Sequence, residues 1–393
     1  MKPLRKKPEV YIWNANALNI LPVLFILFIL IFISVIAISS VKQEMNMSST
    51  LLEKSPSEID GSFFYSLLGA ENHHFLSVLS EEQKNTSFSQ VFIKLATNIN
   101  LDDPRSLLGR ELPAFSLYDS EILVAGDGTN YTNLPLESAP PQPFIEAGKE
   151  AALQRTDEIK RLEEQEKQKP AAAPTTGDKK IVYLYFSHNR ESFLPYLKGV
   201  TDPNLAQHSK INITKLGDVI KEELEMKGIG TTVEKQDIQK LLDKKGWTYT
   251  QSYQGSREVV TAAMTDNKDL SYLIDVHRDS QRRKNTTTTI DGKDYAKIAF
   301  VIGGNNNNFE KNQQLAEELH SILKKKYKSL SRGVILKKGA YTNGKFNQDL
   351  SENSMLVEIG GVDNTFEELN RTSKALADAF SEYYWKAESV NGG

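Results

Sequence analysis

A long apolar run near the N-terminus is the feature that most constrains this chain. No charged side chain lies between residues 10 and 41, and residues 20–38 are almost entirely Leu, Ile, Phe and Val. A helix of that length covers about 28 Å, close to the roughly 30 Å hydrocarbon core of a bilayer. Basic residues precede the run and no basic cluster follows it. The positive-inside rule therefore predicts a cytoplasmic tail over residues 1–18, a single-pass transmembrane anchor over 19–41 and an extracytoplasmic remainder.

Two other interpretations of this run stay open. One is a buried helix of a soluble protein, although such helices rarely have this purity. The other is a cleaved signal peptide, because Ala37-Ile38-Ser39 loosely resembles a cleavage site with small residues. The run exceeds the roughly 7–15 apolar residues of a signal core, so we favour an uncleaved anchor.

Charge and cysteine content exclude some functions. The chain has 48 basic and 51 acidic residues and a net charge of -3, which leaves no positive field to bind a nucleic-acid backbone. Cysteine is absent. Neither disulfides nor thiolate ligands are available, so any metal site must use histidine and carboxylate side chains.

The extracytoplasmic part divides by composition. Residues 42–144 are predicted to form a membrane-proximal region, and residues 145–177 a charged linker that ends in a Pro/Ala-rich tether. Residues 178–393 carry the strongest patterning, and we predict that they fold as a separate catalytic domain. The alternative is that the upstream residues pack against this domain and complete its groove.

The pattern after residue 178 alternates short apolar runs with amphipathic stretches. We predict strands at residues 181–186, 231–233, 270–276, 298–302, 333–336 and 355–359, and helices at 213–224, 258–264, 309–327 and 365–385. An Asp-Gly pair flanked by β-formers predicts a hairpin over residues 286–295. This order is typical of an α/β fold with a mostly parallel twisted sheet and helices on both faces.

Three predicted strands end in residues that can do chemistry. His188 and Glu191 follow the first strand, His277 ends another, and Glu358 lies in the last. Ligands gather at the carboxyl ends of parallel strands, so these side chains are expected to converge. Two histidines and one carboxylate, with water in the fourth position, suit a catalytic zinc ion. Glu358 is the candidate general base, and Gly360-Gly361 beside it is expected to let substrate approach the backbone.

Other polar residues are weaker candidates. Arg278 directly follows His277 and could clamp a substrate carboxylate, although an ion pair with Asp275 or Asp279 explains it as well. His208 is a reserve ligand. The run 305–308, four asparagines, predicts a turn and leaves open a substrate-binding role. The remaining histidines, for which we expect structural or solvent-facing roles, are His73, His74 and His320.

At these residues the chain resembles the stage II sporulation protein P family of endospore-forming bacteria, over about residues 180–385. The motifs that carry the resemblance are Ser187-His-Asn-Arg-Glu-Ser-Phe-Leu-Pro195, Asp275-Val-His-Arg-Asp-Ser280, Phe300-Val-Ile-Gly-Gly304 and Leu356-Val-Glu-Ile-Gly-Gly361. The resemblance implies a fold like that of amidases of the phosphorylase/hydrolase type. It also implies a zinc-dependent N-acetylmuramoyl-L-alanine amidase with endopeptidase activity on cross-linked peptidoglycan. The implied setting is the septal membrane between forespore and mother cell during engulfment, with stage II sporulation protein D (a lytic transglycosylase) and a third membrane protein as partners.

One departure and two rival functions remain. The broader cell-wall amidase family takes its carboxylate ligand from the start of the first helix, where this chain has no acid at residues 210–215. Glu191 must then serve, with three other acids in reserve: Glu222, Glu223 and Glu234. A metallocarboxypeptidase-like enzyme would use a similar ligand set and need a cation such as Arg190 or Arg278. A non-catalytic adaptor that binds the cell wall is the alternative from another class.

Overall fold

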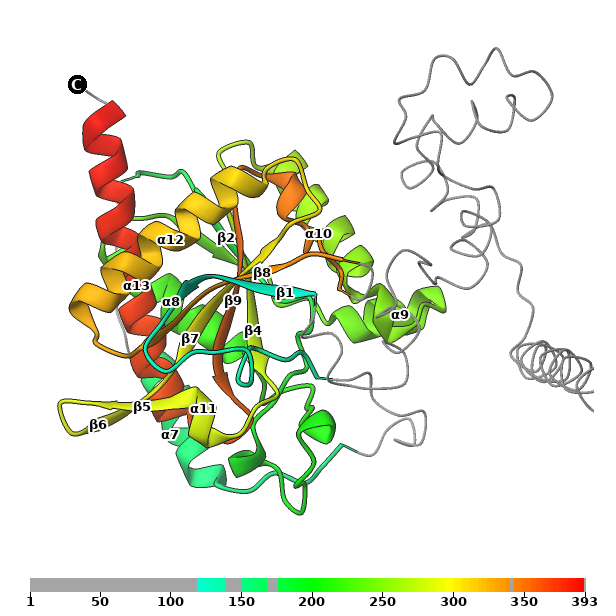
Figure 1. Cartoon of the computed structure of the whole chain (residues 1–393). Helices are drawn as coiled ribbons and strands as arrows, with labels where there is room; N and C mark the ends of the chain where they lie inside the picture. The colour runs from blue at the N-terminus through cyan, green and yellow to red at the C-terminus, as the bar shows by residue number, and fades with distance from the viewer. Residues whose placement is uncertain (1–118, 139–149, 168–175, 340–341, 392–393) are drawn as a thin grey trace, which may run out of the picture. The chain divides into compact units, whose positions relative to one another are not determined.

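The computed structural model describes residues 119–138, 150–167, 176–339 and 342–391 (Figure 1). All of these belong to the second of two compact units, Thr97–Gly393. The anchor predicted at 19–41 and most of the predicted membrane-proximal region lie outside the described residues. Within the described ranges, no helix is both long and apolar enough to cross a membrane.

A seven-stranded sheet forms the centre of the described unit (Figure 1). Its order is β1-β8-β7-β9-β4-β2-β3. The strands span β1 (Ser120–Ala125), β2 (Val182–Tyr185), β3 (Thr231–Val233), β4 (Tyr272–Asp279), β7 (Ile298–Gly303), β8 (Ser331–Lys337) and β9 (Asn353–Gly361). The apolar runs of the central strands fit a sheet that is covered on both faces.

The sheet is mostly parallel, as predicted, but its direction reverses in the middle. Strands β3, β2, β4 and β9 run one way. Strand β7 pairs antiparallel with β9 and parallel with β8, and β1 is antiparallel to β8. Four of the six neighbouring pairs are therefore parallel. The carboxyl ends of β2, β4 and β9 share one edge, whereas those of β7 and β8 point to the opposite edge.

Helices cover both faces of this sheet. The longer helices are α7 (Thr156–Lys167), α8 (Thr214–Met226), α9 (Ile238–Lys245), α10 (Ser252–Asp266), α12 (Phe309–Lys326) and α13 (Phe366–Asn391). Apolar side chains of α8, α12 and α13 pack on one face, in the main core with alternate residues of β2, β4 and β9. The other face carries Tyr183 and Leu273, which α10 covers through Val260. His277 and Glu358 alternate onto this second face.

Short elements connect these helices and strands. The hairpin predicted at 286–295 forms as β5 (Thr287–Ile290) and β6 (Lys293–Ala296). Asp291 and Gly292 at its turn have positive φ of 48° and 72°, the conformation that an Asp-Gly pair tolerates best. The remaining elements are α11 (Arg283–Thr286), η3 (Leu194–Tyr196), η4 (Pro203–Leu205), η5 (Tyr249–Gln251) and η6 (Gln348–Leu350).

The sheet includes residues that precede the boundary predicted at 178. Strand β1, from the predicted membrane-proximal region, pairs with β8 at the sheet edge. Helix α7, from the predicted linker, places Ile159 in the main core. The sequence did not reveal this because β1 is one half-buried edge strand and α7 has only two strongly apolar residues, Ile159 and Leu162. The α/β unit therefore begins upstream of the predicted catalytic domain.

Candidate metal centre

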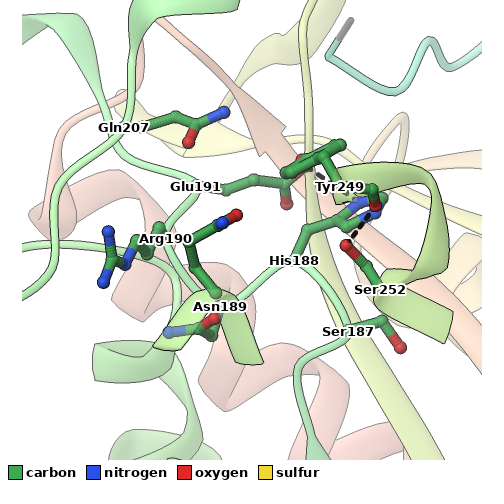
Figure 2. A pocket seen from close by; sticks show the side chains of 9 residues that line it. Ser187, His188, Asn189, Arg190, Glu191, Gln207, Tyr249 and Ser252 are labelled. Atoms are coloured by element: carbon green, nitrogen blue, oxygen red, sulfur yellow. Dashed lines mark hydrogen bonds and ion pairs between the residues drawn. The ribbon is translucent and has the colours of Figure 1, made fainter. Parts of the chain in front are cut away.

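Three side chains predicted as metal ligands meet at the carboxyl edge of β2 and β4. His188, Glu191 and His277 each offer a ligand atom, and these atoms lie within 4.8 Å of one another. Nδ1 of His188 is 3.8 Å from Glu191 Oε1, and Nδ1 of His277 is 3.7 Å from Glu191 Oε2. Figure 2 shows His188 and Glu191 side by side in a small pocket. The group can hold a metal ion.

Local backbone structure explains why these side chains converge. The chain turns tightly after β2, where the Glu191 amide donates to the His188 carbonyl at 3.1 Å. The backbone amide of Arg278 donates to Glu191 Oε2 at 2.9 Å, which fixes the carboxylate against β4. Since β2 and β4 are paired in parallel, the turn after β2 lies beside His277.

Unpartnered buried atoms support a metal ion at this position. Among the described side chains, those with a buried ligand atom and no hydrogen-bond partner include His188 (Nδ1), Glu191 (Oε1) and His277 (Nδ1). Burying such atoms without a partner is costly. The 3.7 and 3.8 Å separations are slightly wider than the about 3.3 Å between ligand atoms about 2.05 Å from a tetrahedral zinc ion. A small inward movement would bring them into range.

Carboxylates dominate the electrostatics around the two histidines. Burial lowers the pKa of His188, and the neighbouring charge of His277 lowers it further. Burial also works against a charged His277, but Asp275, Glu191 and Glu358 outweigh it and raise its pKa to about 10. Asp275 Oδ1 lies 3.0 Å from His277 Nε2. The surrounding carboxylates therefore favour a positive charge at this position.

Glu358 lies beside this group, opposite His277 in the β4–β9 register. Its side chain is buried, and neither carboxylate oxygen has a hydrogen-bond partner among the described residues. Burial raises its pKa to about 8, with His277 and Lys337 acting in the opposite direction. A carboxylate in this setting can take up a proton near neutral pH.

Aromatic rings form one wall of the site. Tyr249 stacks on the His188 ring with centroids 4.9 Å apart. Tyr253 at the start of α10 stacks on His277 at 6.0 Å and meets His188 edge-on at 5.2 Å. Figure 2 labels eight residues of the pocket, whose full lining is Ser187, His188, Asn189, Arg190, Glu191, Gln207, Gln239, Tyr249 and Ser252.

The structure does not support Arg278 as a substrate clamp. Its side chain is fully buried. The guanidinium donates to Ser138 Oγ at 3.0 Å and to the carbonyl oxygens of Asp279 and Ala206 at 3.3 and 3.2 Å. Sequence reasoning placed the residue at the right strand end but could not show that two other segments occupy its donors. Arg278 therefore joins those segments to β4.

The glycine pair after Glu358 and the asparagine run serve packing and turns. A Cβ at Gly361 would lie 2.3 Å from the Gln281 carbonyl oxygen, so protein backbone, not substrate, occupies that space. The run 305–308 follows β7 at the edge opposite the metal group, and Asn306 donates to the Gly303 carbonyl at 2.7 Å. The turn expected at residues 305–308 therefore forms, and the reversed direction of β7 places it away from the metal group.

The reserve ligands lie elsewhere. Nδ1 of His208 accepts from the amides of Lys210 and Ile211, both at 3.1 Å, as a turn requires. His320 contacts Ser331 Oγ at 2.7 Å, the structural role we expected. Glu223 pairs with Lys374 and Glu234 accepts from Tyr183, while Glu222 is not in the metal-binding group. His73 and His74 lie outside the described residues.

Sequence reasoning missed three neighbours of the metal group. Asp275 could have been found, because a residue two before His277 in a strand shares its face. Its carboxylate is fully buried and accepts from the Ser187 amide and hydroxyl at 2.9 and 2.5 Å. Glu137 and Lys337 come from distant segments and form a pair at 3.6 Å close to the histidines. No local pattern indicated either one.

Fold and site together define an α/β protein with a buried group of two histidines and one glutamate that can bind a metal ion. The family model described as Stage II sporulation protein P matches residues 102–381. The chain is also 50% identical to the Stage II sporulation protein P of Bacillus subtilis (strain 168) over 354 residues, 90% of this chain and 88% of that protein. It therefore belongs to the stage II sporulation protein P family, a family of sporulation proteins, and the resemblance described above is confirmed. No solved structure matches the chain.

Proposed function

We propose that this chain is a zinc-dependent peptidoglycan hydrolase, an N-acetylmuramoyl-L-alanine amidase that also cleaves cross-linked stem peptides. One observation carries the proposal: the His188, Glu191 and His277 group lies beside Glu358, a buried carboxylate with no partner of its own among the described residues. Three ligands and one free carboxylate are what metal-assisted amide hydrolysis needs.

Zinc suits the donor set best. Imidazole nitrogen and carboxylate oxygen are common zinc ligands, and catalytic zinc sites use three protein ligands. Metals that prefer thiolates have no ligands in a chain without cysteine. The chemistry that zinc supplies when bound is to make water a nucleophile near neutral pH and to polarise the scissile carbonyl.

Each residue then has a defined task. His188, Glu191 and His277 would hold the ion, with Glu191 fixed by the Arg278 amide. Glu358 would accept a proton from the attacking water and return it to the leaving nitrogen. That task requires the carboxylate form, and a nearby cation would lower the pKa of about 8 that burial gives Glu358. The tyrosine wall would shield the site from bulk water.

A metallocarboxypeptidase-like activity finds less support. Such an enzyme needs a free cation to bind the terminal carboxylate of its substrate. Arg278 is buried and occupied, as described above. Arg190 forms an ion pair with Asp237 at 2.8 Å, with further contacts from its Nε. Neither arginine named as a candidate is available for that role.

The cellular setting is proposed from the family and the apolar N-terminal run. The chain would be anchored in the septal membrane between forespore and mother cell, with its N-terminus in the cytoplasm. Its α/β unit would act outside on peptidoglycan during engulfment. Stage II sporulation protein D and a third engulfment membrane protein would be its partners.

Digestion of purified peptidoglycan tests the enzymatic proposal. The full chain, purified in detergent, would be assayed for zinc content and incubated with the wall material with and without a chelator. Amidase activity releases whole stem peptides with a free L-alanine amine, whereas a carboxypeptidase releases single residues. His208→Ala, outside the metal group, is the control. Zinc-loaded protein that binds the wall but cuts nothing would favour the adaptor.

A further inference from the structure

A short segment upstream of the predicted catalytic domain is fastened across the metal-site face of the sheet. We call residues 133–138 the strap. Leu134 is fully buried and packs on Ala299 and Ile335. The Leu136 amide donates to Asp279 Oδ1 at 3.1 Å, and its carbonyl accepts from the Ser280 amide at 2.8 Å. These contacts fix the backbone of Leu136, the residue immediately before Glu137.

Additional donors hold the two ends of the strap. Arg332 donates to the Asn133 carbonyl and also pairs with the buried Asp279. At the other end, Arg278 donates to Ser138 Oγ at 3.0 Å. Arginine and aspartate side chains are rarely buried in proteins unless they are paired, and here two buried arginines and one buried aspartate hold the strap. Contacts at Leu136 and Ser138 therefore fix the position of Glu137, the residue between these two.

Glu137 faces the metal group. Its Oε1 accepts from the Tyr253 hydroxyl at 3.2 Å, and the ring of Tyr253 stacks on His277. Lys337 Nζ lies 3.6 Å from the same oxygen. Partial burial works against its charge, but Lys337, His188 and His277 outweigh that effect, so the pKa of Glu137 lies below its usual range. Glu137 is thus an anion at the metal group that none of the ligand or base roles uses.

Its exposure distinguishes Glu137 from the other acids of the site. The side chains of Glu191 and Asp275 are at most 1% exposed, whereas that of Glu137 is 27% exposed. Its partner Lys337 is 9% exposed. Among the described residues, Tyr253 and Lys337 are the donors that contact Glu137. The carboxylate can therefore accept a donor from a bound molecule.

Amide hydrolysis creates a donor of the matching charge. The water oxygen bonds to the carbonyl carbon, the C–N bond breaks with its electron pair on nitrogen, and both water protons end on that nitrogen. At neutral pH the products are a carboxylate and an ammonium group. The ammonium forms beside the metal group, where a fixed anion would stabilise the charge as it develops.

We propose that Glu137 binds the nitrogen of the scissile amide as it leaves and forms an ion pair with the product ammonium. Lys337 is the internal cation that neutralises Glu137 while no amine is bound. This inference rests on the proposed amidase function, because the cleaved bond must release an amine. It makes the strap, and not only the motifs after residue 178, part of the substrate site.

The simpler explanation is that Glu137 only braces Tyr253 and Lys337. Glu137→Gln separates the two roles, since an amide oxygen still accepts from the Tyr253 hydroxyl but carries no charge. Glu234→Gln is the matched control. Glu234 also accepts from a tyrosine hydroxyl at 3.2 Å, that of Tyr183, but the Tyr183 ring stacks on Tyr185 and not on a histidine of the metal group.

Peptide binding by the full chain tests the proposal directly. The probes are a synthetic stem peptide with a free N-terminal L-alanine amine and the same peptide with that amine acetylated. Titration calorimetry should show Glu137→Gln weakening the free-amine peptide about 10- to 100-fold, the range of a charged hydrogen bond. Binding of the acetylated peptide, zinc content and melting temperature should stay at the wild-type values, and Glu234→Gln should change none of these.

Three outcomes would overturn the inference. One is equal weakening of both peptides, which would show a structural role. The second is unchanged binding of the free-amine peptide by Glu137→Gln, and the third is failure of that peptide to bind the wild-type protein. The proposed function fails separately, through wild-type protein that lacks zinc or leaves peptidoglycan uncut. A kinetic comparison adds a second readout: Glu137→Gln should slow amide cleavage more than cleavage of the matching ester, which releases an alcohol.

Discussion

The two halves of the sheet contribute to the site in different ways. Strands β2, β4 and β9 run parallel, and their carboxyl ends carry all three ligands and Glu358. In the other half, formed by β7, β8 and β1, strands β7 and β8 run opposite to β9. This half contributes Lys337 and the surface on which the strap lies. On the proposed function, the first half would hold the reacting groups, and the second would hold groups that contact the substrate or product.

This difference in strand direction shows where a sequence motif can predict which residues meet at a site. In a parallel sheet, the end of each strand points to one edge, so residues after different strands meet there by topology alone. A reversed strand breaks this rule, and its side chains reach the site across the face of the sheet instead. The predictions below test whether chemistry is confined to the first half and binding to the second.

The largest effect should come from the ligands of the parallel half. His188→Ala or His277→Ala is expected to abolish zinc binding and peptidoglycan cleavage together, because each removes one of three protein ligands. Elemental analysis and wall digestion measure the two properties. His320→Ala is the control, since that buried histidine contacts Ser331 instead of the metal group. Metal retained in full by either variant would contradict the assignment.

Loss of the base should come next. Glu358→Gln is expected to reduce the cleavage rate about 100- to 10,000-fold, the usual contribution of a general base. Zinc content should stay at the wild-type value, because Glu358 handles a proton and is not in the ligand group. If this variant lost zinc as readily as the histidine variants, Glu358 would be a ligand.

These reacting residues were also the ones that the sequence could predict. His188 follows the apolar run of β2, and His277 and Glu358 lie within β4 and β9, so the pattern indicated both the element and its candidate chemistry. The hairpin at Asp291-Gly292 was predicted for a similar reason, since few residue pairs tolerate two positive φ angles. Local patterns are sufficient where local physics determines the structure.

The second half had no comparable signal. Glu137 lies in a Pro-rich stretch that indicated only irregular structure, and its position depends on Arg278 and Arg332, about 140 and 200 residues further along the chain. The burial of Arg278 had no sequence signal for the same reason, because segments distant in the sequence cover it. Contacts between residues far apart in the sequence fix this half of the site, and the sequence of a single protein does not reveal such contacts.

Stability of the strap should depend on its one large apolar contact. Leu134→Ala is expected to lower the free energy of unfolding by about 2–5 kcal/mol, the usual cost of a cavity at a fully buried leucine. Chemical denaturation of the full chain measures it, and Leu205→Ala, 39% exposed, is the control. A change as small as that of the control would show that the strap does not belong to the folded α/β unit.

The smallest expected effect concerns Asp275, which contacts the ring nitrogen of His277 that does not face Glu191. Its carboxylate contacts His277 Nε2 at 3.0 Å and is itself held by Ser187, so it directs Nδ1 of His277 toward Glu191. Carboxylates that orient a histidine ligand typically contribute about 10- to 100-fold to metal affinity. Asp275 also raises the pKa of His277 toward 10, so a proton competes with the metal below that pH.

The two effects of Asp275→Asn therefore oppose each other: lost orientation weakens metal binding, and weaker proton competition strengthens it. Zinc affinity, measured against a competing chelator, should fall more at pH 9 than at pH 6, because proton competition fades as pH rises. Asp378→Asn, which removes a carboxylate paired with Lys227 and Lys326, is the control and should leave affinity unchanged at both pH values. An equal loss at pH 6 and pH 9 would show that Asp275 orients His277 without governing its proton.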